Sequence, residues 1–225
     1  MGGDGADKGV HYTGAVMSGS SDPVSDSAPD SEQDSGRAAE STVSHARSMG
    51  TWMFVRGVLG FAFGMATIFW PRETLANATQ LTLGVQTVDL VLIAYLVLSA
   101  VLLIGQSRRA DPGVRTALLG QAVVVIPAVI FLFISDTPPE LRAAVCIWAL
   151  LHGGLELWIY WMQRSAAMAS DHLIAAGCHL LLGVIVAFGS DMGALTVFGF
   201  AGAAVLISSV LYMLGGYSRR SRARA

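Results

Sequence analysis

The chain has 225 residues, of which 53% are hydrophobic and only 13% are charged, and its mean hydropathy is +0.57. This composition argues against a soluble protein, and a formal net charge of −2 leaves too little basic surface for binding nucleic acid. The charge is also uneven, because residues 1–48 carry eight acidic and three basic residues whereas the rest of the chain has a net charge of +3. A boundary near Ser48 is therefore expected.

Residues 1–48 form an acidic segment rich in Gly, Ser and Asp. It has too few apolar side chains to offset the entropy lost on ordering, so we expect a disordered tail. It also has no basic start followed by an apolar run, so the first membrane helix is expected to act as the targeting signal. We favour a solvated extension, or a start codon assigned too early with Met17 and Met49 as alternatives, over a segment that binds a partner.

The first apolar run is Thr51–Pro71, with the sequence TWMFVRGVLGFAFGMATIFWP. At about 1.5 Å of rise per residue it covers roughly 30 Å, which is the thickness of the hydrocarbon core of a bilayer. A helix satisfies the backbone polar groups of such a segment within lipid. The run is therefore predicted to be a membrane span.

Five further spans are predicted, after a short interfacial segment from Arg72 to about Leu83. Pro112 suits the first turn of the third span, and the sequence SDTPPELR before the fourth contains a capping box of Thr137 and Glu140. The predicted ranges are 86–106, 115–134, 138–162, 172–189 and 194–214.

The arginines predict the orientation of the spans. Most lie in loops on the side of the amino terminus or in the basic carboxyl-terminal tail, 217–225, whereas the opposite loops contain only Arg72 and Arg142. By the positive-inside rule, both termini are expected in the cytoplasm. Two cytoplasmic termini require an even number of spans, which supports six.

The spans form a threefold internal repeat of helical hairpins, at about 50–107, 112–164 and 171–216 within a transmembrane domain of residues 49–216. In the first helix of each hairpin, Gly64, Pro127 and Gly183 align, with a polar or proline stop about seven residues later in each case. The predicted fold is therefore an all-α integral membrane protein of three tandem αα-hairpins.

Two segments carry a resemblance to a known family. VRGVLGFAFGMATIFWPRETL has small residues before a tryptophan-proline stop, and IWALLHGGLELW has Trp148, Gly153 and Glu156 in the family's second-helix pattern. In these the chain resembles the HdeD-like acid-resistance membrane proteins over roughly residues 50–215. The first connection is longer than the family's, and the third repeat keeps only the glycines. The resemblance implies repeated hairpins and a link to acid or stress tolerance, but no catalytic or binding residues.

Several ionisable or polar side chains fall inside the predicted spans, where an unpaired charge is costly. Counting from the span ends places them at similar depth in the cytoplasmic half, roughly 8 to 10 Å from the surface. We predict that they form one polar cluster, of Arg56, Gln121, His152, Glu156 and His179. An ion pair that fixes helix register is favoured over a pathway for protons or a small solute, and metal binding by His152, Glu156 and His179 is the weakest alternative.

A second group of carboxylates is expected at the outer face, consisting of Glu73, Asp89, Asp136, Glu140 and Asp191. A direct response to external acid would involve these groups, since unperturbed carboxylates titrate at about pH 4. Asp89 lies near the outer end of the second span. For it, a role at the positive end of the helix dipole is favoured over a role in transport.

Small residues on the first, fifth and sixth spans allow close helix contacts, either within the bundle or with another subunit. They are Gly57, Gly60, Gly64, Gly183, Gly199 and Gly202. Cys146 and Cys178 are expected to be small buried side chains. No phosphate-binding loop, activated nucleophile or dense set of metal ligands is recognisable in the sequence, so we expect no enzymatic activity, no cofactor and no metal.

Three functions follow as hypotheses. The leading one is a non-enzymatic, multi-pass membrane protein of the HdeD-like type, linked to acid or stress tolerance. The alternatives are a small transporter or channel that uses the polar cluster, and a structural subunit that binds a partner through its glycine faces. The expected partners are the lipid bilayer and either a second copy of the chain or an unknown membrane protein, with no nucleic acid.

Overall fold

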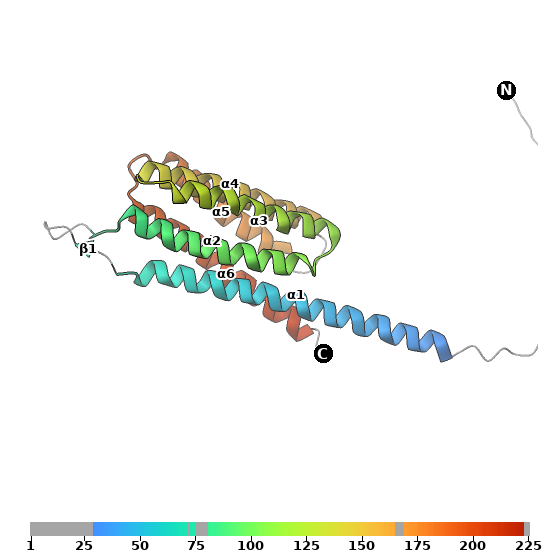
Figure 1. Ribbon diagram of the computed structural model, residues 1–225. Coiled ribbons are helices and arrows are strands. Elements are labelled where there is room, and N and C mark those ends of the chain that lie inside the picture. Colours follow the sequence, from blue (N-terminus) through green and yellow to red (C-terminus); the bar gives the residue numbers. More distant parts are fainter. Residues whose placement is uncertain (1–28, 72, 75–80, 165–168, 223–225) are drawn as a thin grey trace, which may run out of the picture. The chain divides into compact units, whose positions relative to one another are not determined.

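The computed structural model describes residues 29–71, 73–74, 81–164 and 169–222. Within these ranges the chain is helical apart from its connections and one pair of very short strands (Figure 1). The helices are α1 (Pro29–Phe69), α2 (Val85–Ser107), α3 (Pro112–Phe133), α4 (Pro138–Met162), α5 (Ala169–Phe188) and α6 (Ala194–Arg222).

Each of the six helices contains a segment long and apolar enough to cross a membrane, which confirms the predicted fold class and makes this a multi-pass membrane protein. In α1 that segment is Arg47–Phe69. The predicted fourth span coincides with α4, and the predicted second, third and fifth spans agree with α2, α3 and α5 to within a few residues. Apolar runs that are long enough to cross the hydrocarbon core of a bilayer therefore determine the fold class.

The two ends of the chain differ from the prediction. Helix α1 begins at Pro29, well inside the segment expected to be disordered, and residues 1–28 of that segment lie outside the described residues. Extending an existing helix needs no new nucleus, so polar residues ahead of a stable span can join it. The residues divide into two units, Met1–Ala38 and Ala39–Ala225, and the second contains all six spans.

Helix α6 continues to Arg222, so most of the predicted basic tail is also helical. Here there are tertiary contacts to support the extension. The guanidinium carbon of Arg220 lies 5.8 Å from the ring centre of Phe54 on α1. Gly216 of α6 also lies close to the backbone of Phe54. Packing against α1 thus carries the helix beyond the predicted end at Leu214.

The first connection is longer than the others and contains the strands β1 (Glu73–Thr74) and β2 (Leu81–Thr82). They pair antiparallel, with Glu73 opposite Thr82 and Thr74 opposite Leu81. The expected interfacial segment between Arg72 and Leu83 is therefore in part a β-hairpin, whose residues 75–80 lie outside the described residues.

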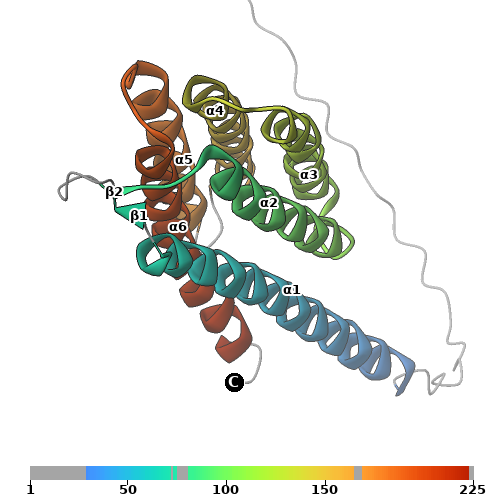
Figure 2. The ribbon, with the colours of Figure 1, turned by 60° about the vertical axis from the view of Figure 1, so that its left-hand side comes forward.

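The three hairpins are arranged around a common centre (Figure 2). The second helices of the hairpins, α2, α4 and α6, contact one another in all three pairings. Each first helix packs against the second helix of another hairpin: α3 against α2, α5 against α4, and α1 against α6. This is the arrangement expected of a threefold repeat of αα-hairpins.

Glycines allow the helices to pack closely at two of these junctions between hairpins. A Cβ added at Gly64 of α1 would lie 2.7 Å from the Cβ of Leu206 on α6, and one added at Gly183 of α5 would lie 2.6 Å from Leu150 on α4. The equivalent position in α3 is Pro127, which is exposed. The α2–α3 junction is correspondingly open, with a groove of ≈ 410 Å³ lined almost entirely by apolar side chains. The repeat is thus tight at two junctions and loose at the third.

Large apolar side chains fill the half of the bundle that contains the α3–α4 and α5–α6 turns. Phe198 is fully buried, with its ring edge-on to Phe63 at 5.9 Å between centroids, and Phe63 stacks on Tyr95 at 4.3 Å. Leu92, Leu141 and Val197 belong to the same core. Most of the buried polar residues, among them Arg56, His152 and Glu156, lie in the other half, whereas Thr67, Asp89 and Ser135 are buried in this one.

Candidate functional site

Glu156 on α4 is the centre of a buried polar network. Its side chain is fully inaccessible, yet both carboxylate oxygens are occupied by hydrogen-bond donors. Arg56 Nη2 and the Tyr212 hydroxyl donate to Oε1, at 2.7 Å and 2.6 Å, and His172 Nδ1 donates to Oε2 at 2.8 Å. The guanidinium of Arg56 pairs with this carboxylate as an ion, and an ionised carboxylate can only accept, so His172 carries its hydrogen on Nδ1.

Arg56 on α1 is the counter-charge of this carboxylate. Its side chain is 7% exposed, and its guanidinium carbon lies 4.5 Å from the ring centre of Tyr212, so the cation also faces an aromatic ring. Nη2 makes a further hydrogen bond of 3.2 Å with His152 Nε2. Since a guanidinium can only donate, Nε2 of His152 must accept, and the ring is then neutral with its hydrogen on Nδ1.

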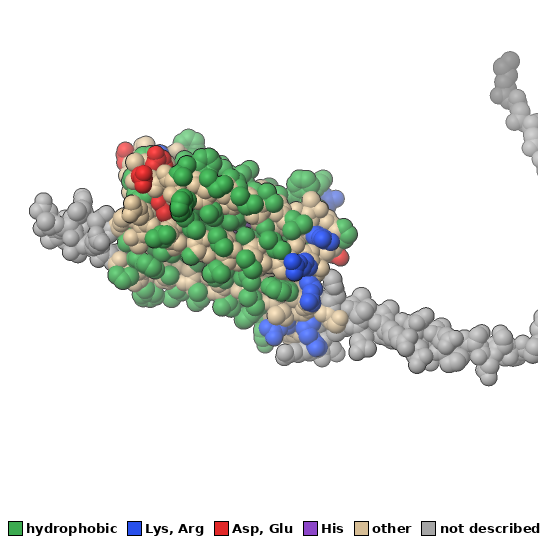
Figure 3. All heavy atoms as spheres, in the orientation of Figure 1, with side chains coloured by type: hydrophobic (Ala, Val, Ile, Leu, Met, Phe, Trp, Pro, Cys, Tyr) green, Lys and Arg blue, Asp and Glu red, His purple; other side chains and the backbone are tan. Residues whose placement is uncertain are grey.

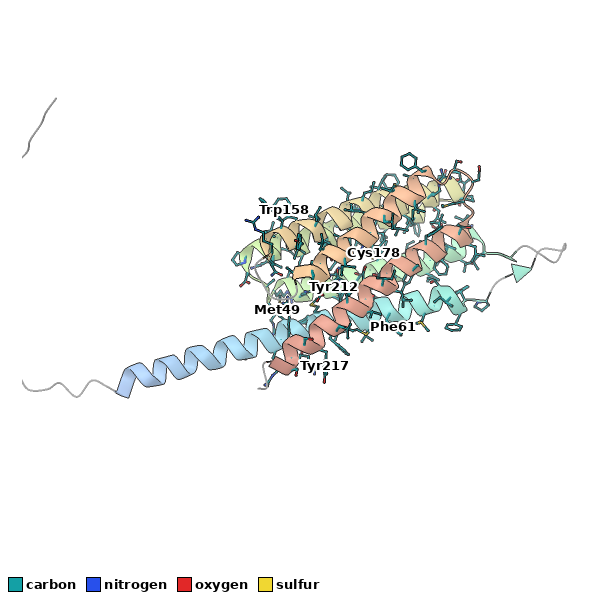
Figure 4. The ribbon with its side chains drawn as sticks, turned by 180° about the vertical axis from the view of Figure 1, so that it is seen from behind. Met49, Phe61, Trp158, Cys178, Tyr212 and Tyr217 are labelled. Atoms are coloured by element: carbon teal, nitrogen blue, oxygen red, sulfur yellow. The ribbon has the colours of Figure 1, made fainter. Side chains whose placement is uncertain are left out.

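These five residues, Arg56, His152, Glu156, His172 and Tyr212, are called the Glu156 network below. They come from α1, α4, α5 and α6, so the network joins all three hairpins. Tyr212 is buried on α6, whereas Tyr217, further along the same helix, is 67% exposed (Figure 4). A paired, hydrogen-bonded charge inside a bundle fixes how the helices are rotated and shifted relative to one another.

A very small cavity borders the Glu156 network. Its volume is ≈ 10 Å³, close to the minimum that one water molecule needs. His152 and His179 line it with their rings 4.8 Å apart, and His152 Nδ1 has no hydrogen-bond partner among the described residues. The other lining residues are Arg56, Tyr95, Val205, Ser208, Ser209 and Tyr212.

The structure brings together four of the five residues of the predicted cluster. Arg56 is hydrogen-bonded to both His152 and Glu156. His179 lies beside His152 with its ring tilted, and its Nδ1 donates to the Ala175 carbonyl at 2.8 Å. Gln121 does not join them. It is fully buried on α3, but neither amide atom has a hydrogen-bond partner among the described residues. The prediction placed Gln121 in the cluster only because of its depth in the membrane. It did not include the rotation of α3 about its own axis, which decides where the side chain lies.

Sequence reasoning missed His172 and Tyr212, which supply two of the three donors to Glu156. A signal for His172 was present, because His172 and His179 are seven residues apart and so share one face of α5. Tyr212 lies at the inner end of its span, at a depth similar to that of Arg56. Both residues lie near the ends of their spans.

The residues predicted at the outer face have different surroundings. Asp136, Glu140 and Asp191 are exposed, and the Glu140 carboxylate accepts the Thr137 backbone N–H at 3.0 Å, as a capping box requires. Of Glu73 only the backbone is described. Asp89 is buried and lies beyond the first turn of α2, which holds no acidic residue, so the expected helix-start role does not fit.

The predicted glycines pack mainly inside the bundle. Added Cβ atoms at Gly57 and Gly60 would meet Met213 and Ser209 of α6, and one at Gly202 would meet Thr67 of α1. Gly199 is the exception among them, because it is exposed and has nothing within 4 Å of an added Cβ. The α1 and α6 glycines are thus already used within the chain, which weakens the hypothesis of partner binding through these faces.

Within the described ranges, no group of three or more His, Cys, Asp or Glu residues could hold a metal ion. Cys146 and Cys178 are half-buried free thiols. Comparison of the chain with protein-family models, with curated proteins and with solved structures finds no match.

Proposed function

We propose that this chain is a non-enzymatic protein of the inner membrane of a bacterium, of the HdeD-like type, and that it contributes to acid or stress tolerance. Three αα-hairpins around a common centre support the resemblance, since repeated hairpins are what the family implies. The observation that carries the non-enzymatic part is the Glu156 network. Its carboxylate is fully buried and both of its oxygens already accept side-chain hydrogen bonds, which supports a structural role over contact with a substrate.

The distribution of charge supports cytoplasmic termini. Figure 3 shows arginines at one end of the bundle and carboxylates at the other, with apolar side chains between them. The basic end includes Arg108, Arg109 and Arg115, near the α2–α3 turn, and the carboxyl-terminal end of α6. By the positive-inside rule this end faces the cytoplasm.

Acid survival tests the proposal. A strain that lacks the gene is expected to survive exposure to about pH 4 less well than the parent, and the intact gene is expected to restore survival. A version with Asp136, Glu140 and Asp191 changed to amides distinguishes a direct response of the outer face from an indirect role. Asp111→Asn is the matched control, because Asp111 is an exposed carboxylate at the basic end. Equal survival of parent and deletion strain would overturn the link to acid.

A proton or small-solute pathway is the second candidate, and the cavity beside His152 and His179 favours it. Two neighbouring imidazoles and a polar lining are suited to proton transfer. Against it, the apolar core around Phe198 and Leu92 fills the other half of the bundle, so the polar path is not continuous. For this reason transport stays second.

Proton flux into liposomes separates the two candidates. Purified protein is reconstituted, a pH gradient is imposed, and wild type is compared with Glu156→Gln and with empty liposomes. Proton flux that requires Glu156 would make the proton pathway the favoured function. Flux no greater than that of empty liposomes would leave the network as a structural element.

A further inference from the structure

Asp89 is the second carboxylate that is buried among the described residues, and only one of its oxygens has a hydrogen-bond partner there. It lies in the second turn of α2 and is 4% exposed. The Ser135 hydroxyl, just beyond the end of α3, donates to Oδ2 at 2.8 Å. The other oxygen, Oδ1, is buried and has no hydrogen-bond partner among the described residues. Buried polar atoms are nearly always paired, so an unpaired carboxylate oxygen needs an explanation.

A pocket of ≈ 240 Å³ opens beside this carboxylate, between α2 and the end of α3. Its polar groups are Gln86, Asp89, Ser135 and Asp136, and apolar side chains such as Leu90 and Phe133 complete the walls. None of the lining residues is basic. Among the described residues that line it, the pocket therefore combines two carboxylates with no positive charge to balance them, and it favours a cationic ligand.

The size and lining of the pocket indicate which kind of cation fits. A bare metal ion would occupy a small part of ≈ 240 Å³, and no set of three metal-ligating His, Cys, Asp or Glu residues is found in the described part of the chain. Apolar walls suit a ligand with a hydrocarbon portion. Asp89 Oδ1 has no hydrogen-bond donor in the described part of the chain. A primary ammonium can supply a donor, whereas a quaternary ammonium has no N–H and cannot.

We propose that the pocket beside Asp89 binds a primary ammonium group, with the Asp89 carboxylate as its main acceptor. Asp136 adds a second negative charge at the rim, and the Gln86 side-chain oxygen is a further acceptor within the lining. The ammonium belongs either to the headgroup of an aminophospholipid or to a free small amine. Both sources present the same chemistry at the end of a membrane span.

Binding of n-hexylamine to the full-length protein tests the proposal. The protein is placed in phosphatidylcholine nanodiscs, which contain no primary amine, and titrated calorimetrically at neutral pH. Saturable binding is expected, and Asp89→Asn should weaken it at least about tenfold, because the substitution removes the charge that pairs with the ammonium. Asp191→Asn is the matched control, since Asp191 is an exposed carboxylate of the α5–α6 turn.

A second variant keeps the test valid if Asp89→Asn folds poorly. Leu90→Trp adds bulk to the wall of the pocket without changing a charge, and it is also expected to weaken binding. The proposal is overturned if wild type shows no saturable binding, or if both Asp89→Asn and Leu90→Trp bind n-hexylamine as wild type does.

Nanodiscs that contain phosphatidylethanolamine distinguish the two sources of the ammonium. If the lipid headgroup occupies the pocket, this lipid should lower the apparent affinity of wild type for n-hexylamine by competition. An affinity that is the same in both kinds of nanodisc supports a free amine as the ligand.

Discussion

Replacing Glu156 by glutamine is the most informative test of the Glu156 network. The substitution keeps the size of the side chain and removes its charge, which leaves the Arg56 guanidinium buried without a counter-ion. Breaking one side of a buried ion pair typically costs about 3–5 kcal/mol. Tyr212 can still donate to the remaining carbonyl oxygen, so we expect the lower part of this range, about 3 kcal/mol, or more than a hundredfold in the unfolding equilibrium.

Reversible unfolding in mixed micelles of a mild detergent and dodecyl sulfate measures this cost, with the fluorescence of the five tryptophans as the signal. The double variant Arg56→Gln with Glu156→Gln completes a double-mutant cycle. Because both charges are then gone, the double variant should cost clearly less than the sum of the two single substitutions. A Glu156→Gln protein within about 0.5 kcal/mol of wild type would refute the structural role of the pair.

Three further predictions concern packing, hydrogen bonding and topology. Gly64→Leu should destabilise the protein by about 1–3 kcal/mol or more in the same unfolding assay, because a side chain there meets α6, whereas Gly199→Leu should have little effect, since Gly199 faces open space. Tyr212→Phe removes the 2.6 Å hydrogen bond to Glu156 and should cost about 1.5–3 kcal/mol, and an unchanged stability would show that this bond contributes nothing. A reporter that works only in the cytoplasm should be active when it is fused to the carboxyl terminus, whereas a reporter that works only in the periplasm should be inactive there. Activity of the periplasmic reporter would reverse the proposed orientation.

The six spans could be predicted because their signal is one-dimensional. A helix that crosses the hydrocarbon core needs about 20 apolar residues, and arginines and prolines mark its ends. The same count gave the depth of Arg56 and Glu156, and their contact follows from depth together with opposite charge. Both inferences require only the number of residues between a side chain and the membrane surface.

Rotation about the helix axis is what the sequence did not reveal. Gln121 has the right depth for the Glu156 network, but α3 turns it elsewhere. His172 has the right rotation and was overlooked because it lies at a span end. Asp89 shows the same limit, since its position near the end of α2 suggested a dipole role, whereas the side chain reaches Ser135 beyond the end of α3. Such contacts depend on how helices face one another, and a single sequence specifies this only through packing.

The two buried carboxylates differ in what they have left to bind, and this difference can be tested directly. Glu156 accepts bonds from three side chains on three other helices, so a ligand could reach it only by displacing a helix contact. Asp89 accepts one side-chain bond and keeps an oxygen beside a pocket.

We therefore expect the two substitutions to have separable effects. Glu156→Gln should lower the free energy of unfolding while the folded protein still binds n-hexylamine. Asp89→Asn should lose n-hexylamine binding and change stability by less than about 1 kcal/mol, because asparagine can still accept the Ser135 hydrogen bond. If each substitution affected both measurements equally, the carboxylates would belong to one coupled system, and the assignment of a structural role to one and a binding role to the other would be wrong.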